Sequence, residues 1–89
     1  MPQLEQEIID TIAEEGDISR NEIKPDSNLF DLGIDSLTAL EILVVLETKY
    51  DIVVGRDRLK NVNNVRQIIS AISDELQKKA KDPTGQSLI

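Results

Sequence analysis

Ser36 is the hydroxyl with the most distinctive setting in this sequence, because it stands between Asp35 and Leu37 where an apolar segment begins. A serine nucleophile needs a base within hydrogen-bond reach and a group that orients that base. Histidine, the commonest such base, is absent, and Lys49 lies more than three helical turns further along. At a helix N-terminus Asp35 would be a weak base, because the positive pole favours the ionised carboxylate. We therefore do not expect self-contained serine catalysis.

Metal and nucleotide chemistry also lack their usual sequence patterns. The chain has no cysteine, so it has neither a disulfide framework nor a thiolate metal site. Asp26, Asp31 and Asp35 lie in one segment, but they lack the dense oxygen-ligand spacing of a calcium loop. Gly33 stands alone rather than in a glycine-rich phosphate loop. We interpret these acids as caps and solvated loop residues.

Charge is divided unevenly along the 89 residues, whose net charge is −7. Residues 1–51 carry thirteen acids and three bases, whereas residues 52–89 carry four acids and seven bases. An acidic half repels nucleic acid and speeds encounter with basic protein surfaces. The small basic cluster in the second half does not make a DNA-reading helix. We therefore expect protein partners and no nucleic acid.

The N-terminal segment MPQLEQEIID is acidic and amphipathic, which is not typical of a signal peptide. No apolar run approaches the roughly 20 residues needed to span a bilayer. Coiled-coil heptads are absent as well. These features predict a cytoplasmic monomer without membrane insertion.

Four helices are predicted by the spacing of the apolar residues and by the cap residues. They span residues 3–15 (up to Gly16), a segment from Asp35 or Ser36 to about Tyr50, a short stretch near residues 56–61, and a segment that follows Asn63 or Asn64. Both Asp35 and Ser36 are good N-caps, and Asn64 with Gln67 has the form of a capping box. The expected fold class is all-α: a small four-helix bundle with three main helices and one short helix. One domain should cover residues 1–81, followed by a flexible tail at residues 82–89.

Aliphatic side chains should build the core, because Phe30 and Tyr50 are the only aromatic residues. The long connection between the first two helices, residues 16–35, should pack over that core through apolar anchors: Ile18, Ile23, Leu29, Phe30 and Leu32. In the second helix the residues expected to point inward are Leu37, Leu40, Leu43, Val44 and Leu46. Ala39, Ile42 and Val45 add apolar surface elsewhere, so helices or a ligand should cover this helix on more than one side.

The heptapeptide DLGIDSL at residues 31–37, followed by an apolar helix, resembles the phosphopantetheine attachment motif of acyl carrier proteins. The segment LEILVVLETKYDI at residues 40–52 is similar to the continuation of that family's second helix. Residues 62–72 are similar to its last helix. The resemblance covers roughly residues 3–78.

The resemblance implies that a phosphopantetheinyl transferase joins 4′-phosphopantetheine from coenzyme A to Ser36. That enzyme, with its magnesium, would bring the base that this chain lacks, and the arm would bring the missing thiol. Acyl groups would then be carried as thioesters and delivered to separate enzymes at high effective concentration. A cleft between helices would be able to shelter the acyl chain. The chain itself would be a carrier and not an enzyme.

The resemblance also implies partner contacts at the second helix. Asp35 would be recognised by the basic surface of the transferase, and Leu37 would be the apolar anchor beside it. Glu41 and Glu47 would contact further partners, namely acyl-loading ligases or transferases and ketosynthase-type processing enzymes. Each residue also has a purely structural interpretation: a cap for Asp35, core for Leu37 and a solvated face for the two glutamates.

The sequence departs from the family pattern in two places. Thr38 stands where many members carry an acid, and Arg56, Arg58 and Lys60 make a basic segment where the family is commonly acidic. We therefore expect a specialised carrier for fatty acid, polyketide or related lipid synthesis, with Arg56 and Arg58 among its partner-recognition residues. Two alternatives remain: an aminoacyl, peptidyl or D-alanyl carrier, and a helical adaptor without a prosthetic group in which Ser36 is only a cap.

Overall fold

The computed structural model of the chain describes residues 2–81, so the predicted tail at residues 82–89 lies outside the described part. The helices are α1 (Pro2–Gly16), the 3₁₀ turn η1 (Arg20–Glu22), α2 (Ser36–Tyr50), α3 (Arg56–Leu59) and α4 (Val65–Lys81). No strand occurs among these residues, and one isolated bridge pairs Asn28 with Asn64. The predicted all-α fold with three main helices and one short helix is confirmed.

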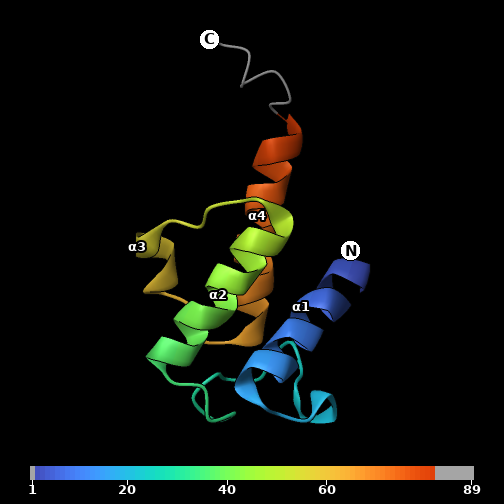
Figure 1. Cartoon of the computed structure of the whole chain (residues 1–89), viewed down its shortest axis with the longest axis vertical. Coiled ribbons are helices and arrows are strands. Elements are labelled where there is room, and N and C mark those ends of the chain that lie inside the picture. Colours follow the sequence, from blue (N-terminus) through green and yellow to red (C-terminus); the bar gives the residue numbers. More distant parts are fainter. Residues whose placement is uncertain (1, 82–89) are drawn as a thin grey trace.

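The three long helices form the body of the molecule (Figure 1). α1 contacts both α2 and α4, and α2 contacts α4. α3 lies beside α2, and the connection between α1 and α2 crosses one end of the bundle (Figure 1). Aliphatic residues fill the core as predicted, and α1 contributes Leu4, Ile8 and Ile12 to it from one face.

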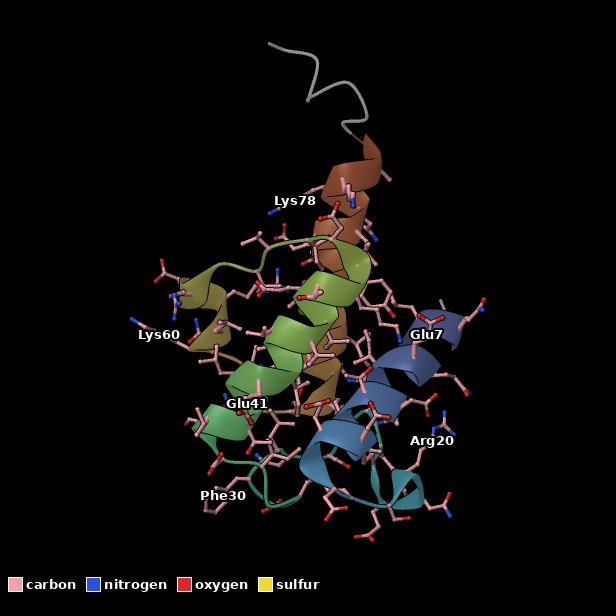
Figure 2. The ribbon with its side chains drawn as sticks, in the orientation of Figure 1. Glu7, Arg20, Phe30, Glu41, Lys60 and Lys78 are labelled. Carbon is pink, nitrogen blue, oxygen red and sulfur yellow. The ribbon has the colours of Figure 1, made fainter. Side chains whose placement is uncertain are left out.

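The connection between α1 and α2 is fixed to the start of α4 by backbone hydrogen bonds. The Leu29 amide donates to the Asn63 carbonyl at 2.9 Å, and the Val65 amide donates to the Ser27 carbonyl at 3.0 Å. Ile23 and Leu29 are buried as predicted. The prediction for Phe30 is wrong: its side chain is 82% exposed and points away from the connection (Figure 2).

The prediction for the buried face of α2 is confirmed for Leu43 and Leu46 and is wrong for Leu37, Leu40 and Val44. Ile42, Leu43 and Leu46 are buried, whereas Leu37 is 64% exposed and Val44 is 49% exposed. Leu40 is exposed as well. The helix is apolar around most of its circumference, so its periodicity is a weak guide to the buried side. The partners α1 and α4 select that side.

α4 begins with the reciprocal cap that the sequence predicts. The Gln67 amide donates to Asn64 Oδ1 at 2.9 Å, and the Asn64 amide donates to Gln67 Oε1 at 3.2 Å. Val65, Ile68 and Ile72 are then fully buried along one face. The cap fixes the first turn of α4. The connection that leads into α2 is hydrogen-bonded to this turn, so the cap also helps to fix the start of α2.

Candidate functional site

Ser36 is the first residue of α2, and Asp35 is the cap of that helix. Asp35 Oδ1 accepts a hydrogen bond from the Thr38 amide at 2.8 Å, so one of the free donors of the first turn is satisfied. The Ser36 side chain is exposed, and its hydroxyl has no hydrogen-bond partner among residues 2–81. Of the two candidate caps, the structure therefore assigns the structural role to Asp35 and leaves the Ser36 hydroxyl free.

The carboxyl group of Asp35 is held in its ionised form. The hydrogen bond from the Thr38 amide is the main reason that its pKa lies below the ordinary aspartate value of 3.8. The side chain is exposed, so the charge is available to a partner. Asp35 thus serves as a cap and as an accessible anion beside Ser36.

A buried anchor sets the direction of the chain just before the site. Ile34 is buried, and its amide donates to the Leu29 carbonyl at 2.9 Å. Gly33 has a φ of 81°, a left-handed conformation that glycine adopts without strain. With Ile34 turned into the core, the next two residues, Asp35 and Ser36, stand at the surface.

A cleft of about 390 Å³ opens beside Ser36, between α2 and the segment that contains α3. Its lining residues are Ser36, Ala39, Leu40, Leu43, Arg56, Leu59, Lys60, Val62 and Asn63. A second hollow of about 270 Å³ shares Ser36, Ala39, Val62 and Asn63 and extends toward Phe30. Ser36 thus borders two hollows, of which the first is lined mainly by aliphatic residues and the second by both apolar and polar residues. A group attached to its hydroxyl has an apolar shelter within reach.

The predicted partner residues fall into two groups. Leu37 and Glu41 are exposed on α2, and Arg56 is exposed on α3; the ribbon with side chains shows Glu41 on the outward side of α2 (Figure 2). Glu47 and Arg58, by contrast, already have partners within the fold. Glu47 Oε2 accepts from the Val54 amide at 2.7 Å, and Arg58 pairs with Asp74 on α4 at 2.7 Å.

Sequence reasoning missed part of the site. Leu40 lines the cleft from an exposed position, and Val62 and Asn63 line both hollows. Asn63 was predicted only as a possible cap, although it lines the same two hollows as Ser36. No signal in the sequence marks Val62 and Asn63, because only the fold brings the segment between α3 and α4 next to α2. Within residues 2–81 no helix is both long and apolar enough to cross a bilayer.

The residues present fit a covalently attached arm: a free hydroxyl at a helix N-terminus, which favours an attached phosphate, and an apolar cleft next to it. Comparison with known proteins points the same way. The family described as phosphopantetheine attachment site matches residues 6–78. The acyl carrier protein of Buchnera aphidicola is 32% identical over 80 residues, which are 89% of this chain and 100% of that protein.

A second relative, the acyl carrier protein of Chlorobium phaeobacteroides, is 30% identical over 71 residues, or 79% of this chain and 91% of that protein. Matches of this extent cover nearly all of the folded part of the chain. They identify a carrier rather than a catalyst, and they imply covalently attached 4′-phosphopantetheine. The chain belongs to the acyl carrier protein family.

Proposed function

We propose that Ser36 is the attachment point of the 4′-phosphopantetheine arm, and that the chain carries acyl groups for a specialised synthetic pathway. The observation that supports this most strongly is the division of roles at the start of α2. Asp35 caps the helix, whereas the Ser36 hydroxyl is exposed and borders both hollows. A serine that is only a cap would hold a bond of the kind that Asp35 makes.

The chain presents Ser36 but does not activate it. No side chain within residues 2–81 bonds to the Ser36 hydroxyl, so the base for the transfer must come from the transferase. The N-terminus of α2 favours the phosphate that is added there. When it is attached, the arm supplies a thiol on which acyl groups are held as thioesters. The cleft between α2 and α3 then shields an apolar acyl chain from water.

Asp35, Leu37 and Glu41 form the surface around Ser36 that we propose for the transferase and the acyl-handling enzymes. All three are exposed. An accessible anion beside an exposed leucine fits a partner that offers a basic group next to an apolar pocket. Glu47 and Arg58 already form bonds within the fold. They can contact a partner protein only through the side-chain atoms that these bonds do not use.

The test is a loading reaction with coenzyme A, magnesium and a broad-specificity phosphopantetheinyl transferase, read by the intact mass. The wild-type protein should gain the mass of one arm, and Ser36→Ala should gain none. The alanine variant should fold, because Asp35 provides the cap. Ser19→Ala is a matched control, since Ser19 is exposed and makes no side-chain cap bond. No gain on wild type, or an equal gain on Ser36→Ala, would favour the helical adaptor.

The pathway is tested separately, with the loaded protein. Because α3 and its cap carry the exposed residues Arg56 and Lys60, we propose a dedicated set of partners rather than the general fatty acid synthase. The loaded chain should be a poorer substrate than a standard carrier for a housekeeping ketosynthase and malonyl transferase. Equal use of both carriers would overturn the specialised role. Loading by aminoacyl-activating rather than acyl-activating ligases would favour the aminoacyl carrier instead.

A further inference from the structure

Two cations beside the cleft lack partners. Five cations in the described part of the chain form ion pairs: Arg20, Arg58, Arg66, Lys78 and Lys79. The side chains of Arg56 and Lys60 form neither an ion pair nor a hydrogen bond within residues 2–81. Both line the cleft that contains Ser36. Lys24 and Lys49 also lack an ion pair there, but neither lines the cleft.

Arg56 begins α3 and Lys60 is the cap that follows its last residue, and the Lys60 amide donates to the Arg56 carbonyl at 3.2 Å, so the two lie on the same side of this turn. Residues four apart along a helix are neighbours on its surface, whereas Arg58, between them, points to the other side. Arg58 Nη1 donates to Asp74 at 2.7 Å and Nη2 to Ser70 at 3.3 Å, and both partners are on α4. This contact holds α3 against α4. Arg58 is thus committed to α4, whereas Arg56 and Lys60 are both lining residues of the cleft beside α2.

The cleft is locally positive in an acidic protein. Within residues 2–81, Arg56 and Lys60 are its only charged lining residues, and its apolar lining residues include Leu40, Leu43 and Leu59. The Lys60 side chain extends outward from the end of α3 (Figure 2), and Lys60 also lines the cleft, so we infer that its ammonium lies at the outer edge of the cleft. Cations at the mouth of an apolar cleft attract an anion that accompanies an apolar group.

We propose that Arg56 and Lys60 form an anion-binding site at the mouth of the cleft, which takes a phosphate or carboxylate brought there on the arm. This inference rests on the proposed function. Two sources share the chemistry: the phosphodiester on Ser36, which would stand next to the Asp35 carboxylate, and a carboxylate on the cargo. Arginine binds either group through two parallel hydrogen bonds.

The test compares four forms of the protein by their thermal unfolding midpoint: apo, arm-loaded, octanoyl-loaded, and loaded with an acyl chain of the same length that ends in a carboxylate. Loading of Ser36 is first verified by intact mass. Each form is prepared as wild type, as Arg56→Gln/Lys60→Gln, and as the matched control Lys24→Gln/Lys49→Gln. The control removes two exposed positive charges away from the cleft.

If the phosphate is the ligand, the change in midpoint from apo to arm-loaded protein should be about 1–5 °C less favourable in Arg56→Gln/Lys60→Gln than in the control. If the cargo carboxylate is the ligand, the same deficit should appear between the octanoyl and the carboxyacyl forms. Either deficit should shrink at high salt. The charge-conserving variant Arg56→Lys/Lys60→Arg should not show the deficit.

The proposal is overturned if both changes in midpoint are the same in Arg56→Gln/Lys60→Gln as in the control. It also falls if Ser36 accepts no arm, because no anion would then be brought to the cleft. The mass measurement separates the two failures. A loaded protein without the midpoint difference refutes the anion site alone, and an unloaded protein refutes the attachment as well.

Discussion

The two ends of α2 are held in different ways. At the N-terminal end the helix is capped by its own neighbour Asp35, and both Ser36 and Leu37 are exposed. At the C-terminal end the Tyr50 hydroxyl donates to Glu7 Oε1 on α1 at 2.5 Å. Lys79 Nζ, on α4, donates to the Asp51 carbonyl at 3.0 Å. One end is therefore held locally, and the other is tied to both neighbouring helices.

The difference shows how the fold separates stability from function. The buried residues Ile42, Leu43 and Leu46 and the long-range bonds lie in the middle and C-terminal part of α2. The first turn of α2 can then meet enzymes or carry a large group without disturbing the core. Substitutions at the anchored part should change stability, and substitutions at the free end should change recognition.

The comparison of Leu46→Ala with Leu37→Ala is the strongest test of this contrast, because both variants lose the same side-chain atoms. Leu46 is fully buried, so its truncation should cost about 2–5 kcal/mol of unfolding free energy. Leu37 is 64% exposed, and its truncation should change stability by less than about 0.5 kcal/mol. Urea denaturation measures both. If both variants lost the same unfolding free energy, the first turn of α2 would belong to the core as much as the part that contains Leu46.

Tyr50→Phe should lower the free energy of unfolding by about 1–2 kcal/mol, because it removes the hydroxyl that bonds to Glu7. Burial, reinforced by this bond, raises the pKa of the Tyr50 phenol, so the hydroxyl stays a donor throughout the neutral range. A double-mutant cycle with Glu7→Ala, followed in urea, isolates the pair. A coupling energy of zero would contradict the anchoring role.

Asp35→Ala should destabilise the protein by less than Leu46→Ala, and the loss should depend on pH. Because the cap bond lowers the pKa of Asp35, its contribution is fully present above the ordinary value of 3.8 and is lost as the pH falls through the lowered value. The gap in urea midpoint between wild type and Asp35→Ala should therefore close in strong acid. The control is Asp31→Ala, at a nearby exposed aspartate. If the difference in urea midpoint between wild type and Asp35→Ala did not change with pH, the ionised carboxylate of Asp35 would not be the source of the cap's stability.

Lys79→Met should have the smallest effect, below about 1 kcal/mol, because the pair with Asp51 is exposed. The loss should diminish at high salt, since part of it is a screened charge interaction. Lys78→Met is the matched control, because Lys78 pairs only with Glu75 on its own helix. If the two variants lose the same stability, Lys79 does not tie α4 to the end of α2.

Features that depend on neighbours in the chain were predictable. The bounds of α2 and the reciprocal cap of Asn64 and Gln67 follow from residue types a few positions apart. The buried face of α2 was predictable only in part, since Leu43 and Leu46 are buried as predicted but Leu37 is not. Apolar residues occur on most sides of this helix, and only the contacts with α1 and α4 choose among them. Phe30 shows the same limit, since an apolar residue in a long connection does not have to reach the core.

By itself the sequence determined a four-helix chain in which Ser36 begins an apolar helix. It also showed that the chain has no histidine to act as a base for this serine and no cysteine to supply a thiol. It left Asp35 and Ser36 equal as caps and placed Glu47, Arg56 and Arg58 together as partner residues. Only the tertiary structure separated them: Arg58 reaches Asp74, 16 positions away, whereas Arg56 and Lys60 are left at the cleft. The physical reason is that a side chain's role depends on which distant segments the fold brings within bonding distance, and local patterns do not encode those distances.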